Sequence, residues 1–469
     1  MSPDVIIVGA GTAGCVLAAR LSADPGREVL LLEAGPDYRS ADLPAHLADG
    51  MHGPSLDGHD WELTGLACGR ELAAPRGRVV GGSSAVNATF ALRGSPYDYD
   101  GWGLPGWSFE EVLPSFVAVE RDLDFGSAPY HGDAGPVPIR RYAGDELSPS
   151  TTAVLESTVA AGIPWIDDHN APYAVGVSTT PVNALGGRRM SAALTHLEAA
   201  RTRPNLTVRG DTVVASVDIR AGRAHGVTLA DGSSIAAGSS IAAGEVIVCC
   251  GTYASPRLLR RSGIAMASVG SNLIDHPAVT IVVPYLGSPG DWAVFQAAAT
   301  LHSASADPTT DPPDLQIFVG GHYPDRPDVF FIGAALLKPR SRGLVDADHI
   351  DFNYFDDPSD LARLAEAVER AEQIVAGAAV TRLTGGDRLS PRPSTRAERE
   401  DWIRAEAFTY HHPVGTCAMG TVVDADCRVV EVAGLSVVDA SAMPDIPSAN
   451  TNLPTLMLAE HVSSRWLSG

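Results

Sequence analysis

The chain has 469 residues but no apolar run near the ~20 residues that a membrane-spanning helix needs, so no membrane span is expected. Basic residues are scarce: 34 lysines and arginines stand against 56 acidic residues, and the formal net charge is −22. This excess of negative charge argues against nucleic acid or an anionic membrane surface as a partner. Cysteine is scarce too, and the six cysteines lack metal-ligand spacing, which predicts reduced, buried thiols and no metal site.

The sequence leaves little room for a secretory leader, because an apolar strand is predicted to begin at Val5; we expect a cytoplasmic protein. Hydrophobic residues make up 45% of the chain and charged residues 19%, which is typical of a folded protein. Because 469 residues exceed the size of one ordinary hydrophobic core, we expect two domains.

The first stretch with a specific pattern is a glycine turn. The apolar run Val5–Val8 predicts a buried parallel strand, and Gly9, Gly11 and Gly14 follow it in the spacing G-x-G-x-x-G. The first glycine permits a tight turn, the second lets the backbone approach a pyrophosphate, and the third lets the next helix pack closely. Alone, this spacing also occurs in turns that bind nothing.

The residues after the turn make dinucleotide binding the favoured interpretation. Val16–Leu21 has helical character, so the N–H groups that begin the helix would face the phosphates. A second apolar run, Val29–Leu32, ends in Glu33, nineteen residues beyond Gly14 (33 − 14). A carboxylate at this distance is expected to accept hydrogen bonds from an adenosine ribose.

Further segments are ambiguous on their own. The glycine-rich stretch 75–87 could lie flat against a planar group, with Ser83 and Asn87 offering polar contacts, or could simply start a helix. Gly251 follows an apolar strand and opens a second strand-to-helix turn. The aromatic residues between 278 and 355 are scattered, and we interpret them as core rather than as a pocket.

Taken together, segments in this order resemble the glucose–methanol–choline (GMC) family of flavin-dependent alcohol oxidoreductases. They are the amino-terminal glycine turn, Arg76–Asn87 with Arg93-Gly94, Gly251–Ile264, Val269–His276, Leu337–Gly343, His412–Gly420 and Val437–Glu460. The resemblance implies FAD as the cofactor. The residues that it places at FAD are Gly9, Gly11, Thr12, Ala13, Gly14, Glu33, Ala34, Arg78, Val80, Gly82, Ser83, Asn87, Ala88, Val214, Gly251, Asp439, Ala440 and Asn452.

The same resemblance implies a catalytic pair. Oxidation of an alcohol needs a base near the hydroxyl group, and histidine is suited to this near neutral pH. His412 matches the family pattern His-x-x-Gly-Thr, and Asn452 is assigned as its hydrogen-bonding partner. We interpret His411 as a supporting residue and Asn450 as a loop-capping residue.

The chain departs from the family at three places. Val86 stands where some members attach FAD through a histidine, so we expect FAD to be bound non-covalently. The segments 264–269 and 343–350 are shorter than in many relatives, which would reduce the lid over the active site.

The expected fold is of the α/β and α+β classes: a Rossmann-like FAD-binding domain with a parallel sheet (1–145, 186–277 and 420–469) and a substrate domain (146–185 and 278–419) whose antiparallel sheet and helices cover the flavin. The expected activity is oxidation of a small-molecule alcohol by hydride transfer to FAD N5. The electron acceptor is quinone-like, a protein or oxygen, with a dehydrogenase favoured over an oxidase. The alternatives are a flavoprotein that mainly passes electrons to a redox partner, and a non-redox lyase or decarboxylase.

Overall fold

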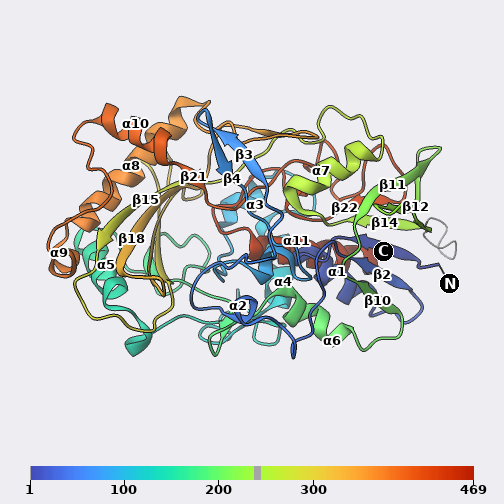
Figure 1. Ribbon diagram of the computed structural model, residues 1–469, viewed down its shortest axis with the longest axis horizontal. Coiled ribbons are helices and arrows are strands. Elements are labelled where there is room, and N and C mark those ends of the chain that lie inside the picture. The colour runs from blue at the N-terminus through green and yellow to red at the C-terminus, as the bar shows by residue number, and fades with distance from the viewer. Residues whose placement is uncertain (1, 237–243, 469) are drawn as a thin grey trace.

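The computed structural model describes residues 2–236 and 244–468. A five-stranded sheet lies in one half of the molecule and a six-stranded sheet in the other, at the right and the left of Figure 1. Both sheets take strands from distant parts of the chain, so neither half is one continuous segment.

The five-stranded sheet is parallel, with the order β10-β2-β1-β14-β22. Its central strands are nearly all Val, Ile and Leu, because both of their faces are covered by other elements. The carboxyl ends of parallel strands form one edge, where ligands bind in folds of this type. The strands are β1 (Val5–Val8), β2 (Val29–Leu32), β10 (Leu206–Arg209), β14 (Glu245–Val248) and β22 (Leu435–Val437).

Two helices that are far apart in sequence pack together beside this sheet. The helix α1 begins directly after the glycine turn and contacts α11, the final helix, and Arg20 Nε of α1 donates to Glu460 Oε2 of α11 over 2.6 Å. The amino and carboxyl ends of the chain thereby form one core. The helices of this half and its loops are α1 (Thr12–Leu21), α2 (Ala45–Ala48), α3 (Pro96–Asp100), α4 (Phe109–Val119), α6 (Glu198–Ala200), α7 (Gly251–Arg261) and α11 (Asn452–Ser468).

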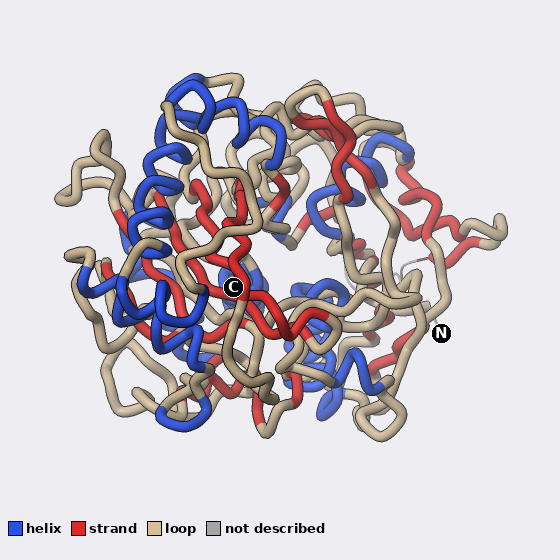
Figure 2. The backbone as a smooth tube through the Cα atoms, turned by 60° about the vertical axis from the view of Figure 1, so that its left-hand side comes forward, coloured by secondary structure: helices blue, strands red, loops and turns tan. Residues whose placement is uncertain are grey.

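The six-stranded sheet is antiparallel, with the order β21-β15-β18-β17-β16-β7. Helices pack along one of its faces, as Figure 2 shows. The strands are β7 (Gly176–Thr179), β15 (Pro277–Pro284), β16 (Phe295–Leu301), β17 (Leu315–Tyr323), β18 (Arg326–Leu336) and β21 (Phe408–Thr409), and the helices are α5 (Pro149–Ala160), α8 (Pro358–Val375), α9 (Ala378–Thr384) and α10 (Arg396–Glu406).

Local sequence explains the longest of these helices, α8. Asp357 caps it by accepting a hydrogen bond from Ser359 N over 2.8 Å, and Pro358 occupies the first turn, where its missing N–H costs nothing. Leu361, Leu364 and Val368 recur at helical spacing and are buried against the sheet.

The two faces of the antiparallel sheet differ in chemistry. The face under the helices is mostly aliphatic: Ile317, Val319 and Ile332 belong to one large core cluster with α8. On the opposite face, Phe318 and Phe331 pack in a separate, mainly aromatic cluster. Because successive side chains of a strand alternate between faces, this division follows from the order of residues along β17 and β18.

Smaller sheets complete the fold. They are formed by β3 (Thr64–Ala67), β4 (Arg70–Ala73), β19 (Leu344–Val345) and β20 (Ile350–Asp351); by β5 (Glu120–Asp122) and β6 (Val137–Ile139); by β8 (Ala184–Leu185) and β9 (Arg188–Arg189); and by β11 (Val214–Arg220), β12 (Arg223–Leu229) and β13 (Ser234–Ala236). Within 2–236 and 244–468, no helix has the length and apolar character to cross a membrane.

The predicted fold class is confirmed, since a parallel Rossmann-like sheet and an antiparallel sheet with helices occur in the same chain. The predicted domain boundaries stay a prediction. One detail is informative: Leu72 and Ala74, inside the segment 1–145, pack in the core of the antiparallel half. The cause is the pairing of β3 with β20, which joins the two halves.

Candidate active site

The backbone segments at Gly9–Gly11, Cys249 and Gly82 approach so closely at the glycine turn that no side chain fits between them. A Cβ atom on Gly9, whose φ is +98°, would lie 2.5 Å from the carbonyl oxygen of Cys249. A Cβ atom on Gly82 would lie 2.6 Å from Cα of Gly11, so the two glycine turns meet backbone to backbone. The predicted contact of both turns with one planar or phosphorylated group is therefore sterically reasonable.

Glu33 is buried at the end of β2 and connects this strand to the turn. Its carboxylate accepts hydrogen bonds from the backbone N–H of Ala10 and of Gly35, each over 2.9 Å. Burial raises the pKa of Glu33 to about 7, although these N–H groups act in the opposite direction. Each carboxylate oxygen keeps a second lone pair, which fits the predicted contact with a ribose hydroxyl.

Asp439 makes the equivalent connection at the end of β22. Its Oδ2 atom accepts from Gly251 N over 2.8 Å and from Ser255 Oγ over 2.6 Å, both at the start of α7. Burial raises the pKa of Asp439. The structure thus brings together Asp439 and Gly251, which the sequence assigned to FAD from segments 188 residues apart.

The remaining residues assigned to FAD differ in exposure. Arg78 is exposed and lies over the ring of Trp61, with 5.4 Å from its guanidinium carbon to the ring centre. Val80 and Val214 are buried. Half-buried residues from separate segments are Gly9, Gly11, Thr12, Ala34, Ser83, Asn87, Ala88, Gly251, Ala440 and Asn452, and the buried ones within the turns are Ala13, Gly14 and Gly82. Backbone-lined turns, a helix N-terminus and buried carboxylates form a donor and acceptor set that fits a dinucleotide.

The catalytic pair predicted from the sequence stays a prediction, and the structure places a different amide, that of Asn450, against His412. His412 Nε2 lies 3.0 Å from the amide nitrogen of Asn450, whereas Asn452 accepts a hydrogen bond from Thr12 Oγ1 over 3.0 Å. Asn452 is the first residue of α11, where the chain turns, so its side chain leaves the loop toward α1. Asn450 precedes this turn and faces the histidine.

Further contacts fix the histidine in place. The backbone N–H of His412 donates to Asp275 Oδ1 over 2.8 Å, and Tyr354 Oη donates to Asp275 Oδ2 over 2.6 Å. Burial holds the pKa of His412 well below its usual range, so the ring is neutral and can accept a proton. His411, in contrast, is exposed, with a positive φ of 68°.

Sequence reasoning missed two neighbours of this histidine. His276 Nδ1 lies 3.0 Å from His412 Nδ1, and the ring of Tyr410 lies 4.5 Å from that of His412. His276 ends the segment Asn-Leu-Ile-Asp-His, which contributed to the family resemblance without receiving a role. For Tyr410 the available signal was its position two residues before His412.

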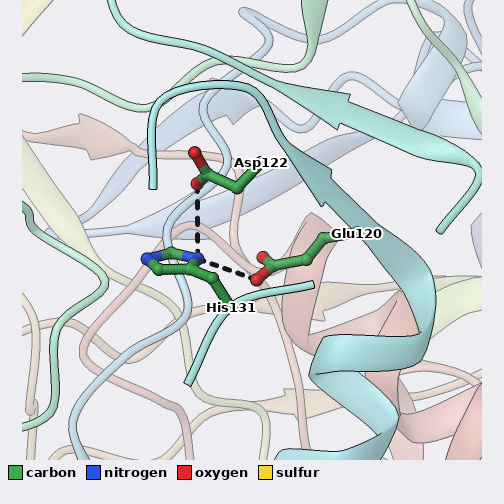
Figure 3. A group of neighbouring side chains, drawn as sticks. All are labelled: Glu120, Asp122 and His131. Atoms are coloured by element: carbon green, nitrogen blue, oxygen red, sulfur yellow. Dashed lines mark hydrogen bonds and ion pairs between the residues drawn. The ribbon is translucent and has the colours of Figure 1, made fainter. Parts of the chain in front are cut away.

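A second buried group has the composition of a metal site (Figure 3). His131 Nδ1 lies 2.8 Å from Glu120 Oε1 and 3.3 Å from Asp122 Oδ2, and all three side chains are buried. Both carboxylates already form ion pairs with arginine side chains: Arg93 Nη2 lies 2.9 Å from Glu120 Oε1, and Arg141 Nη1 lies 2.6 Å from Asp122 Oδ1. We therefore interpret the group as a buried ion-pair network, not as a metal site.

Asp168 completes this network. It accepts from His131 Nε2 over 2.8 Å and from Arg141 Nη2 over 2.7 Å. The three carboxylates are balanced by two arginines and one histidine, provided that the histidine is protonated. Accordingly, hydrogen bonds to Asp168 and Glu120 raise the pKa of His131 against the opposing effect of burial.

This network predicts a pH dependence of stability. Because the pKa of His131 is raised in the folded protein, its protonation stabilises the fold. This contribution is complete below pH 6.5, the ordinary pKa of histidine, and is lost as the pH rises through the raised pKa. The pKa of Asp168 is lowered to about 2. Its ionised carboxylate therefore stabilises the fold above pH 3.8, the ordinary pKa of aspartate, and this stabilisation is lost as the pH falls toward 2. Denaturant unfolding at a series of pH values should show the loss of stability on the alkaline side for the wild type. His131→Gln should lack this loss, and an equal loss in both proteins would contradict the assignment.

Comparison with known proteins agrees with this geometry. Two models of the GMC oxidoreductase family match residues 3–278 and 339–459. The chain is 34% identical to 5-(hydroxymethyl)furfural oxidase of Methylovorus sp. (strain MP688), over 99% of this chain and 98% of that protein. It is 33% identical to oxygen-dependent choline dehydrogenase of Paraburkholderia phymatum, over 98% and 92%.

A solved structure has a similar fold over the whole chain. Pyridoxine 4-oxidase from Mesorbium loti superimposes with a TM-score of 0.90 at 29% identity, covering 100% of this chain and 99% of that one. Members of the matched family bind FAD, for which the glycine turns, Glu33 and Asp439 provide a fitting site. The chain therefore belongs to the GMC oxidoreductase family.

Proposed function

We propose that the protein oxidises an alcohol to an aldehyde or ketone, with FAD as cofactor and His412 as the general base. The observation that carries the proposal is the convergence of His412 Nε2 and Asn450 Nδ2, 3.0 Å apart in a buried position. These are the two groups that alcohol oxidation requires: a neutral imidazole that takes the hydroxyl proton, and an amide that donates to the oxygen.

The geometry supports the following roles. An alcohol oxygen placed between the two side chains would replace their mutual hydrogen bond, donating its proton toward His412 Nε2 and accepting from the amide of Asn450. As the proton leaves, negative charge grows on the oxygen, and the amide hydrogen bond stabilises it. FAD, when bound, supplies the acceptor for the hydride. Glu33, Asp439 and the glycine turns would hold it, with Asn452 at the N-terminus of α11.

The aromatic face of the antiparallel sheet supports a planar, uncharged alcohol as substrate. Phe318 stacks on Tyr410 with 4.6 Å between ring centres and 11° between planes, and Tyr410 packs against His412. The ring centres of Phe295 and Phe331 lie 6.4 Å and 6.2 Å from the ring centre of Phe318. An aromatic surface therefore extends from the strands to the proposed base.

This surface offers no carboxylate partner for a cationic substrate, so a cation would contact ring faces alone. The strands β15, β16 and β17 contain no Asp, Glu, Lys or Arg, and in β18 Arg326 pairs with Asp328 at the far end, over 3.3 Å. Asp275 is near His412, but both of its oxygens accept hydrogen bonds from protein groups. We therefore propose a furan-like or other aromatic primary alcohol, in line with the name of the furfural oxidase relative, rather than choline.

Phe318→Leu should raise the KM for benzyl alcohol by ~2- to 10-fold, because one aromatic pair contributes ~0.5–1.5 kcal/mol. The matched control is Phe330→Leu, which removes a ring from the opposite, helix-covered face of the sheet. The KM for cyclohexylmethanol, which has no aromatic ring, should change less in Phe318→Leu. Equal effects of the two variants on the KM for benzyl alcohol would contradict the proposed surface.

The sequence-based preference for a dehydrogenase over an oxidase stays a prediction. Two relatives are named oxidases and the choline enzyme is named oxygen-dependent, which supports oxygen as a competent acceptor. We propose that the reduced enzyme passes its electrons to oxygen as well as to quinone-like acceptors. Oxygen uptake compared with dye reduction during turnover measures the division between the two.

We expect FAD to be bound non-covalently, because Val86, buried behind the second glycine turn, has no nucleophile. Acid precipitation of the yellow holoenzyme should release all of its flavin into the supernatant. The supernatant absorbance, compared with the flavin content before precipitation, gives the released fraction. Flavin that stays with the pelleted protein would overturn this expectation.

A further inference from the structure

We propose that His276 is a positioning residue: through its hydrogen bond to His412 it fixes the tautomer in which Nε2 of His412 is free to take a proton. This inference rests on the proposed function of His412. His276 comes from the loop before β15 and His412 from the loop after β21, so the tertiary fold brings them together. Their rings are 5.2 Å apart and nearly perpendicular.

The tautomer follows from the hydrogen bonds around His412. An amide nitrogen can only donate, so the contact of Asn450 Nδ2 with His412 Nε2 requires Nε2 to be the acceptor. A neutral imidazole carries one proton, which is then on Nδ1. Among residues 2–236 and 244–468, the hydrogen-bond partner of His412 Nδ1 is His276 Nδ1, at 3.0 Å, which must therefore accept. His276 in turn carries its own proton on Nε2.

The surroundings of His276 keep it neutral and therefore able to accept. Its side chain is completely buried. Burial and the charge of Lys338 lower the pKa of His276 to about 3. Lys338 Nζ is itself held by Asp98 Oδ1 at 3.2 Å and by Asp445 Oδ2 at 2.6 Å. A fixed cation beside His276 opposes transfer of the catalytic proton onto it.

This arrangement matters when the alcohol reacts. The O–H bond of the alcohol breaks and a bond from hydrogen to Nε2 of His412 forms, while FAD, when bound, would accept the hydride from carbon. His412 is then a buried cation. Its Nδ1–H donates to the lone pair of His276, and a hydrogen bond of this charge-assisted type is stronger than a neutral one. His276 changes no covalent bond; it orients the base and stabilises its protonated form.

Two substitutions separate this role from simple packing. Asparagine places an oxygen near the position of His276 Nδ1, so His276→Asn keeps an acceptor for Nδ1–H. His276→Leu has a similar shape but no acceptor, and it leaves the N–H of His412 buried and unpaired. In the holoenzyme, mixed anaerobically with benzyl alcohol, His276→Leu should reduce FAD ~10- to 100-fold more slowly than the wild type, by analogy with metal-ligating histidines that lose their hydrogen-bonding partner. His276→Asn should recover most of the rate.

The matched control for loss of a buried imidazole is His461→Leu. His461 is buried in α11 and bonds Ser115 and the carbonyl of Gly106. The His461→Leu variant should keep the wild-type rate of FAD reduction. The pH profile of FAD reduction should also shift to lower pH in His276→Leu, because the protonated form of His412 is less stabilised and its pKa falls, and should shift less in His276→Asn.

A second readout does not depend on activity. In ¹⁵N-histidine NMR spectra of the holoenzyme, His412 should show a protonated Nδ1 and an unprotonated Nε2, and His276→Leu should broaden or reverse this pattern. Protonation at Nε2 in the wild type, or equal rates for the leucine and asparagine variants, would overturn the proposal. If no alcohol reduced wild-type FAD, the proposed function would fail, while the NMR result would still decide the tautomer.

Discussion

His412→Ala is expected to reduce FAD ~10²–10⁴-fold more slowly than the wild type when mixed with an alcohol, the range for loss of a positioned base. The ring is neutral because burial lowers its pKa, and its Nε2 faces the side chain of Asn450. Stopped-flow absorbance of the flavin under anaerobic conditions measures the rate. The FAD content should be unchanged, because no predicted cofactor contact involves this side chain.

His411→Ala is the natural control, since it removes an adjacent imidazole. The backbone carbonyl of His411 accepts from Arg76 Nη1 over 3.1 Å, while its side chain is exposed and is not bonded to Asn450. We expect a much smaller loss of rate. A wild-type rate in His412→Ala together with a slow His411→Ala would move the base by one residue.

Asn450→Ala should slow FAD reduction by ~10²–10³-fold, the cost of one donor to a developing oxyanion. The amide is buried and directed at His412, so its loss removes the hydrogen bond to the alcohol oxygen. Stopped-flow reduction at saturating alcohol separates this effect from weaker binding.

Asn452→Ala is the matched control, with the same chemical change two residues along the chain. Its amide oxygen accepts from Thr12 at the start of α1, so we expect weaker retention of FAD and a nearly normal rate in fully loaded enzyme. The reverse result, a slow Asn452→Ala and a normal Asn450→Ala, would support the assignment made from the sequence and contradict the role proposed for Asn450.

The parts of the site that the sequence predicted are those set by neighbouring residues. The glycine turn is local: an apolar strand, Gly9, Gly11 and Gly14, and a helix follow one another, and packing leaves no room for larger side chains. Glu33 was assigned from its distance along the chain, and the structure places it against the same turn through Ala10. Local patterns of this kind predict local geometry well.

The parts that the sequence could not predict depend on contacts between distant segments. Which of Asn450 and Asn452 faces His412 depends on where α11 begins, a boundary that the pattern of residues does not specify. The contact of His276 with His412 joins positions 136 residues apart. The aromatic residues appear scattered along the sequence, and only the pairing of β16, β17 and β18 gathers Phe318 and Phe331 on one face.

The ion-pair network shows the same limit. Arg93 was part of a family-like segment, yet its charge is balanced by Glu120 in β5, and His131 and Asp168 join from two loops. Nothing in the spacing of these residues along the chain shows that their charges balance only when His131 is protonated.

Anaerobic mixing of the holoenzyme with a panel of alcohols tests the central claim most directly. The panel should contain furfuryl and benzyl alcohol, cyclohexylmethanol and choline, each followed by the absorbance of the flavin. We expect the flavin absorbance to be lost with the planar aromatic alcohols and to change little with choline, with the aldehyde formed in an amount equal to the FAD reduced. A flavin that dithionite reduces but that no alcohol in the panel reduces would contradict the proposal that this protein is an alcohol oxidoreductase.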